Sequence, residues 1–103
     1  MMSKRKATAH LTPAAIDDLK RIPGNQRAAL IDAIDTLEKQ PRPHTSKKLT
    51  IPGTDQELRR LRLGKWRIII YLLWQDTPII LGVRQRPPYD YQDIDRLLSE
   101  WKE

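Results

Sequence analysis

Two adjacent strand-like segments, at residues 57–63 and 66–74, constrain the fold of this chain more than any other feature. The first reads ELRRLRL, so Leu61 and Leu63 would leave one face of a strand while Arg60 and Arg62 leave the other. The second reads WRIIIYLLW, a β-branched and aromatic composition typical of a covered central strand. A break at Gly64 separates them. The pattern predicts a central β-hairpin with arginines on one face, and because arginine is rarely buried unpaired, we expect an anionic ligand there.

Length and composition limit the chain to a single domain, residues 1–103, and exclude several classes of protein. It contains no cysteine, which excludes disulfides and thiol chemistry. The basic N-terminus lacks the apolar run of a signal peptide, and the longest apolar run, 68–74, is far shorter than the roughly 20 residues that span a bilayer. We therefore expect a cytoplasmic protein with no membrane contact. His10 and His44 lack the clustered spacing of metal ligands, so we predict no metal site and no cofactor.

The positive charge of the chain is concentrated in its middle. Lys and Arg number 19 against 13 Asp and Glu, a net charge of +6, and residues 42–86 alone hold ten of those cations and three of the anions. Basicity alone is a weak indication of nucleic-acid binding, but its concentration on the predicted sheet strengthens it. The same arginines could instead be solvated strand positions or charges that protect a sheet edge.

The order of elements predicts an α+β fold with the sequence β-α-α-β-β-β-α. An N-terminal strand at 5–11 precedes two helices, which form a hairpin packed on an antiparallel meander, and a C-terminal helix follows at 90–102. The loop at 40–53 contains a short extended piece at 48–51.

Spacing of apolar residues assigns the faces of these elements. The first helix begins after Thr12, an N-cap followed by proline, and its apolar face would hold Ala15, Ile16, Leu19 and Ile22. The second helix, 25–39, would bury Leu30, Ile31, Ile34 and Leu37. In the last strand, 79–86, strict alternation places Ile79, Leu81 and Val83 on one side and Ile80, Gly82, Arg84 and Arg86 on the other. The C-terminal helix carries Ile94, Leu97, Leu98 and Trp101 on one face.

Three short motifs resemble those of the RelE/ParE superfamily of bacterial type II toxins. They are the segment LRLGKWRIIIY at 61–71, the segment GVRQR at 82–86 followed by tyrosines, and the upstream KKL at 47–49. The resemblance covers nearly the whole chain. It implies a RelE-like fold and, for the ribosome-dependent members, cleavage of mRNA in the ribosomal decoding site next to 16S rRNA. It also implies neutralisation by a neighbouring antitoxin, which we expect to be acidic and to form an oligomeric complex with the toxin.

The resemblance assigns candidate catalytic roles by position. Arg67 resembles the arginine that holds the scissile phosphate, and Arg84 resembles the second phosphate-binding arginine. Tyr89 or Tyr91 would be the C-terminal tyrosine that stacks on a base, and an ungapped count falls between the two. Either tyrosine could instead pack at a strand-to-helix corner. Further contacts to the RNA backbone are expected from the surrounding cations, namely Lys47, Lys48, Arg60, Arg62, Lys65 and Arg86.

One departure from the family bears on the chemistry. Arg60 and Arg62 stand where RelE-type nucleases carry two lysines, and arginine does not lose its proton because its pKa lies above about 12. Cleavage that uses the 2′-OH of the substrate as nucleophile would still need only orientation of that hydroxyl, neutralisation of the phosphorane and a proton for the leaving group. Two other functions therefore remain open: inhibition of DNA gyrase by binding, as in ParE, or antitoxin binding by a degenerate family member.

Overall fold

The computed structural model describes residues 9–51, 53, 55–64, 67–85 and 93–102. Eight elements follow one another along the described residues. They are β1 (His10–Leu11), α1 (Pro13–Lys20), α2 (Gly24–Lys39), β2 (Ser46–Leu49), β3 (Glu57–Leu63), β4 (Arg67–Trp74), β5 (Thr77–Gln85) and α3 (Ile94–Lys102). The expected α+β fold and its element order are confirmed, with a short extra strand, β2, at the place of the predicted extended piece.

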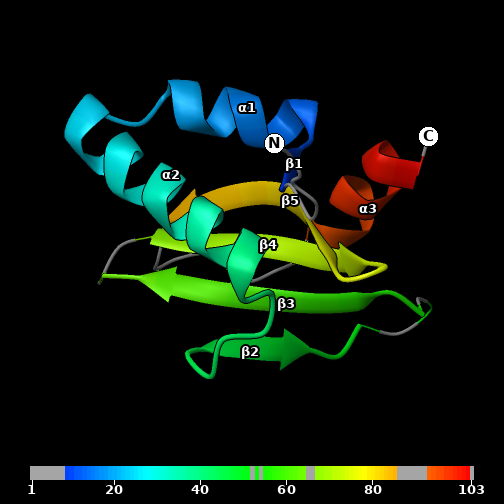
Figure 1. The fold of residues 1–103 in the computed structure, drawn as a ribbon. Coiled ribbons are helices and arrows are strands. Elements are labelled where there is room, and N and C mark those ends of the chain that lie inside the picture. The colour runs from blue at the N-terminus through cyan, green and yellow to red at the C-terminus, as the bar shows by residue number, and fades with distance from the viewer. Residues whose placement is uncertain (1–8, 52, 54, 65–66, 86–92, 103) are drawn as a thin grey trace, which may run out of the picture.

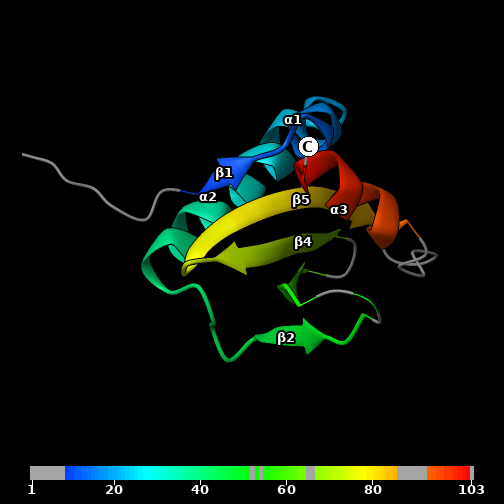
Figure 2. The same ribbon diagram turned by 90° about the vertical axis from the view of Figure 1, so that its right-hand side faces the viewer.

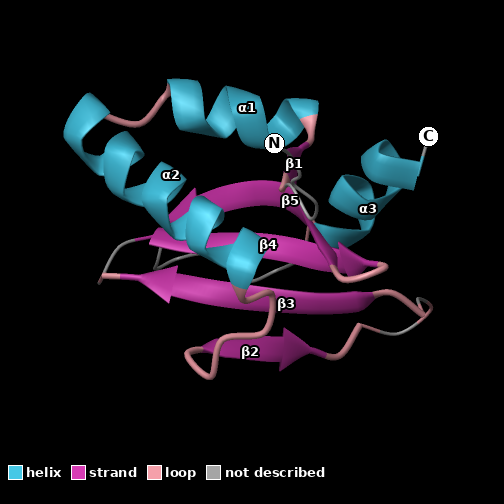
Figure 3. Cartoon of the chain, viewed as in Figure 1, coloured by secondary structure: helices cyan, strands magenta, loops and turns pink. Residues whose placement is uncertain are grey.

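The strands form one five-stranded sheet in the order β1-β5-β4-β3-β2 (Figure 1). Strands β2 to β5 are antiparallel to their neighbours, while the two-residue β1 pairs in parallel with β5 at Ile79 and Ile80. The helices gather toward the β5 side of the sheet, and β2 lies at the opposite edge (Figures 2 and 3). Because β1 is so short, the outer edge of β5 beyond Ile80 has no strand beside it among the described residues.

The helical hairpin covers one face of the sheet. Thr12 caps α1, because its hydroxyl accepts a hydrogen bond from the Ala15 backbone, and Pro13 occupies the first helical position. The same hydroxyl bonds to the Ile80 and Leu81 carbonyl oxygens at 3.1 and 3.3 Å, so the helix start is fixed to β5. The buried residues of the two helices are Ala15, Leu19, Ile22, Leu30, Ile34 and Leu37.

Two predicted core positions in this hairpin are wrong. Ile16 and Ile31 are 42% and 43% exposed, respectively. Each follows directly after a buried residue, and a step of one residue turns about 100° around a helix. A helix packed on a sheet through a narrow stripe therefore leaves such a position at its margin.

The opposite face of the sheet holds a second apolar cluster under α3. Its members are Leu58, Ile68, Ile70, Leu72, Ile79, Leu81, Ile94, Leu97 and Leu98, with Trp101 packed at its border. The amphipathic reading of the last helix is confirmed for its described residues. None of the described helices has both the length and the apolar composition needed to cross a bilayer.

A β-bulge overturns the predicted faces of the last strand. Ile70 pairs with Gly82, but Tyr71 pairs with Ile80, so Leu81 is an extra residue on β5. Val83 therefore shares the helical-hairpin face with Ile80, and Leu81 lies in the cluster under α3. Strict alternation fails here because one inserted residue reverses the faces of everything after it.

Candidate functional site

Arg60 and Arg62 of β3 lie on the α3 side of the sheet, whereas Arg59 pairs with Tyr71 and lies on the helical-hairpin side. Arg60 pairs with Ile70 and Arg62 with Ile68, and both isoleucines belong to the cluster under α3. Directly opposite side chains share a face in an antiparallel pair, so the predicted separation of Arg60 and Arg62 from Leu61 and Leu63 is confirmed. Leu58 lies on the same face as Arg60 and Arg62. Lys47 of β2 pairs with Arg60 and shares this face. We call Lys47, Arg60 and Arg62 the cationic row; none of them makes an ion pair with a residue that the structure describes.

Arg84 of β5 continues this row across the sheet. It pairs with Ile68, which in turn pairs with Arg62, so the two arginines lie on one face with one strand between them. Adjacent strands are about 4.8 Å apart, which puts their backbones roughly 10 Å from each other. Lys48, by contrast, pairs with Arg59 and leaves the opposite face.

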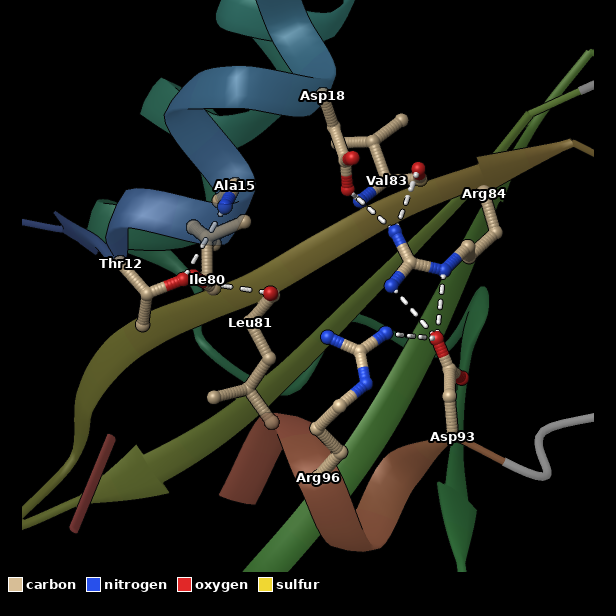
Figure 4. A network of polar contacts seen from close by, with 9 residues as sticks. All are labelled: Thr12, Ala15, Asp18, Ile80, Leu81, Val83, Arg84, Asp93 and Arg96. Carbon is tan, nitrogen blue, oxygen red and sulfur yellow. Dashed lines mark hydrogen bonds and ion pairs between the residues drawn. The ribbon is translucent and has the colours of Figure 1, made fainter. Parts of the chain in front are cut away.

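The guanidinium group of Arg84 lies between two carboxylates (Figure 4). Its Nη1 forms an ion pair with Asp18 of α1, and its Nη2 and Nε donate to Oδ2 of Asp93 at 2.7 and 3.1 Å. Burial by itself lowers the pKa of Arg84, but the hydrogen bond to Asp93 and the charges of Asp18 and Asp93 outweigh burial and raise the pKa. Arg84 is therefore a permanent cation that the fold has already supplied with anions.

Asp18 has a second role at the open edge of β5. Its Oδ2 accepts a hydrogen bond from the Val83 backbone at 2.9 Å, at the part of the strand that β1 does not reach. The side chain is 16% exposed. Asp18 therefore satisfies an edge N–H that would otherwise lack a strand partner, and α1, β5 and Arg84 are joined through one carboxylate.

Gly82 makes room for this network. A Cβ at this position would lie 3.0 Å from Nη1 of Arg84 and 3.2 Å from Oδ2 of Asp18. Its backbone does not have a positive φ, so the requirement for glycine comes from space. The glycine that follows the bulge thus allows the Arg84 side chain to fold back over its own strand toward α1.

Arg67 reaches the same region from the other side of the sheet. It pairs with Leu63, which packs on the helical-hairpin cluster, and its Nη2 donates to Oε1 of Gln26 at 3.0 Å. Its Nε is buried and has no hydrogen-bond partner. A buried donor without a partner is uncommon, and it marks Arg67 as a group that a ligand or water could satisfy.

A cleft of about 1140 Å³ brings Arg67 and Arg84 together between α1, β5 and α3. Two further arginines, Arg21 and Arg96, line it, and its carboxylates are Asp17, Asp18 and Asp93. The cationic row does not line this cleft. The two arginines given catalytic roles therefore line one cleft, whereas Lys47, Arg60 and Arg62 form a separate surface on the same sheet face as Arg84.

Four predicted site residues, Lys65, Arg86, Tyr89 and Tyr91, lie outside the described residues. Sequence reasoning missed Asp18, Asp93, Arg21 and Arg96, all of which line the cleft. Asp93 carries a local signal, because an acidic residue just before a helix is favoured there. Nothing in the chain links it to Asp18 and Arg84, which lie on two other elements.

The cleft suits binding of a phosphate more than transfer of a proton. Arginine forks bind phosphate oxygens in a bidentate manner and stabilise charge that develops on them. They do not act as bases at physiological pH. Among the described residues, no group of three or more His, Cys, Asp or Glu side chains is arranged to hold a metal ion.

Comparison with known proteins identifies a family that matches most of this chain. Residues 9–86 match the family model described as the ParE toxin of the type II toxin–antitoxin system parDE. No match is found among curated protein sequences.

Solved structures give the same result. In the archaeal RelE–RelB complex from Pyrococcus horikoshii, a chain with 27% identity matches with a TM-score of 0.66, over 79% of this chain and 96% of that one. The toxin–antitoxin complex RelBE2 from Mycobacterium tuberculosis matches at 25% identity with a TM-score of 0.64, over 78% and 98%. The isolated RelE toxin of E. coli is 11% identical and supports the fold alone, with a TM-score of 0.66 over 90% and 99% of the two chains.

Proposed function

The chain belongs to the ParE toxin family, within the RelE/ParE superfamily of type II toxin–antitoxin systems, and on this premise we propose that it is a ribosome-dependent endoribonuclease that cuts mRNA and inhibits translation in the cytoplasm. The structural relatives above 20% identity include two RelE proteins that were crystallised with their antitoxins. The proposal also draws on the site, where two arginines from different strands line one cleft.

The observation that carries the proposal is the distribution of cations on the α3 face of the sheet. Lys47, Arg60 and Arg62 have no carboxylate partner among the described residues, and the pairing register extends their row to Arg84. Repeated unpaired cations at strand spacing fit the repeated phosphates of a nucleic-acid backbone. An RNA strand would therefore run along the cationic row, with the scissile phosphate in the cleft.

The chemistry requires no nucleophile from the protein. The 2′-OH of the substrate attacks the adjacent phosphorus, the 5′-oxygen leaves with a proton, and a 2′,3′-cyclic phosphate remains on the upstream fragment. Arg67 and Arg84 would neutralise the phosphorane, and one preorganised donor at such a site contributes about 3–4 kcal/mol to the transition state. The proton transfers would fall to the ribosome, to water or to Tyr89 or Tyr91, and the reaction would need no metal.

An antitoxin is the expected protein partner. Two of the structural relatives are toxin–antitoxin complexes, and this chain carries its excess of cations between residues 42 and 86. A partner that covers the cationic row would need an acidic surface, because an uncompensated row of cations attracts negative charge.

Mapping of RNA ends after brief induction tests the proposal. We expect wild-type protein to produce discrete cuts within translated codons. Neutralising two cations with Arg60→Gln and Arg62→Gln together should reduce those cuts by about tenfold or more, because each lost phosphate contact weakens binding. The control is the double variant Lys20→Gln and Lys39→Gln, which removes the same charge from exposed helix positions. Equal cutting by the two double variants would contradict the proposed RNA path.

Inhibition of DNA gyrase is the second candidate function. It is favoured by the ParE description of the matching family and by arginines at the two positions where RelE-type nucleases carry lysines. The same induction experiment separates the two activities. Intact mRNA with double-strand DNA breaks would indicate gyrase inhibition, and a culture that keeps growing would indicate a degenerate member that only binds its antitoxin.

A further inference from the structure

We propose that Asp93 occupies the phosphate position on Arg84, and that an RNA phosphate binds the cleft by replacing this carboxylate while Asp18 keeps the arginine in place. The inference rests on the proposed function and adds two positioning residues to it. It makes the start of α3 part of the binding event, because Asp93 directly precedes Ile94, where this helix begins.

The hydrogen bonds of Arg84 require such an exchange. A guanidinium group has five N–H donors. Two of them, on Nε and Nη2, are directed at Asp93, and Nη1 donates to Asp18 and to the Val83 carbonyl oxygen. Four donors are therefore engaged within the protein. A phosphate that takes two donors from Arg84 must displace one of these partners.

Asp93 offers the same contact that a phosphate would make. One of its oxygens accepts both Nε and Nη2, which is the side of the guanidinium that also forms bidentate bonds with phosphate oxygens. It is the more exposed of the two carboxylates, at 26% against 16% for Asp18. It also forms an ion pair with the exposed side chain of Arg96 at 3.5 Å.

Asp18 is the more buried of the two carboxylates and also bonds to the backbone of β5. It projects from α1, whose neighbouring residues Ala15 and Leu19 are buried in the core, and it also accepts the Val83 N–H. Its removal would leave a strand-edge donor and the Nη1 side of Arg84 without an acceptor. Asp18 therefore fixes the position of the guanidinium, and Asp93 controls access to it.

Charge favours the exchange once an anion reaches the cleft. Asp18 and Asp93 together offset the positive charges of Arg84 and Arg96, so this network attracts an approaching phosphate only weakly. Departure of Asp93 leaves Arg84 and Arg96 with Asp18 as the one carboxylate of these ion pairs, which gives the network a positive charge. The incoming phosphate then meets Arg84, Arg96 and the buried Nε of Arg67, all of which line the cleft.

Titration of the purified protein with inorganic phosphate tests the exchange without any cleavage. The readout is the NMR signal of the Arg84 Nε–H group, together with the backbone amides at the start of α3. For wild type we expect both sets of signals to move together. Asp93→Asn should lower the apparent Kd for phosphate by roughly fivefold or more, as is typical for a coupling between two sites.

Asp95→Asn is the matched control. It removes the same charge from the first turn of the same helix, but Asp95 is exposed and forms no hydrogen bond or ion pair with Arg84. We expect it to change the Kd by less than about twofold, as for a screened surface charge. Asp18→Asn should have the opposite effect from Asp93→Asn and weaken phosphate binding, provided that circular dichroism shows a folded protein.

Equal affinities of Asp93→Asn and Asp95→Asn for phosphate would overturn the proposal, as would phosphate shifts that leave the Arg84 Nε–H signal unmoved. The result is separable from the proposed function. If wild type cuts no mRNA but Asp93→Asn still tightens phosphate binding, the exchange stands and the nuclease proposal fails. If mRNA is cut and both variants bind phosphate alike, the nuclease proposal stands and the exchange fails.

Discussion

Single side chains of this protein connect two elements, and Thr12 is the clearest example. Its hydroxyl oxygen accepts the Ala15 N–H and so caps α1, while its hydroxyl proton is directed at the Ile80 and Leu81 carbonyl oxygens of β5. The residue is 6% exposed, so water does not replace these bonds easily. Because α1 supplies Asp18 and β5 supplies Arg84, this threonine joins the two elements that carry the ion pair.

Removal of this hydroxyl should destabilise the protein. We expect Thr12→Ala to lower the free energy of unfolding by about 1–2 kcal/mol, the cost of a lost N-cap in a buried site. Thr12→Ser keeps the hydroxyl and is the matched variant. Urea unfolding of the two proteins measures the difference, and equal midpoints would show that neither the cap nor the bond to β5 contributes to stability.

Arg84 shows what the sequence can predict about a site residue and what it cannot. The sequence identifies it as a candidate phosphate ligand from the glycine two positions earlier and from its resemblance to the family. The sequence does not reveal that Asp18 and Asp93 contact it, since those residues come from other elements and their meeting depends on how α1 and α3 pack. The sequence could therefore suggest phosphate binding as the role of Arg84, but it could not predict the ion pairs that Arg84 forms within the protein.

At the scale of elements, the sequence predicted the strands of the meander but not the β-bulge at Leu81 in β5. Apolar and β-branched patterns define β3, β4 and β5 because each has a clear turn signal at its ends. The pairing shift between Ile70 and Tyr71 leaves no such signal, since Leu81 looks like any other residue of an apolar strand. The shift decides that Arg84 shares a face with Arg62, which the sequence could not establish.

A second polar cluster ties the loop after α2 to the strands. Glu57 of β3 accepts hydrogen bonds from Arg42 in that loop, at 2.9 to 3.2 Å, and from Arg59 at 2.9 Å. Arg42 also forms an ion pair with Asp76 in the β4–β5 turn at 3.0 Å. The hydrogen bond from Arg42 is the main cause that lowers the pKa of Glu57 below its ordinary value of 4.5.

This shift predicts a loss of stability in acid. The folded protein holds Glu57 ionised to a lower pH than the unfolded chain does, so the stabilisation is complete above pH 4.5 and is lost as the pH falls through the folded value. Glu57→Gln should therefore be less stable than wild type at pH 7, and the gap should shrink by pH 3. Urea midpoints at the two pH values measure it. An unchanged gap would mean that the ionisation of Glu57 does not contribute to stability.

At the scale of the whole molecule, the fold separates two groups of cationic side chains. The cleft arginines are accompanied by aspartates of α1 and α3, whereas Lys47, Arg60 and Arg62 are not paired with any described carboxylate. The overall charge of +6 could be read from the sequence and indicated an anionic partner. Its division into a compensated cleft and an uncompensated row depends on register and helix packing, so only the structure could reveal it.

The proposed nuclease function requires that the cleft arginines contact the phosphate that is cut. The most direct measurement is the single-turnover rate of mRNA cleavage on programmed ribosomes by wild type and by Arg67→Ala, with Lys39→Ala as a control at an exposed helix position. Arg67 makes a single hydrogen bond with a side chain, to the exposed Gln26, so its loss should leave the fold intact. We expect wild type and the control to cut at equal rates and Arg67→Ala to cut about 100–1000-fold more slowly, as for a lost transition-state donor. Equal rates for all three proteins, or no cleavage by wild type, would contradict the account.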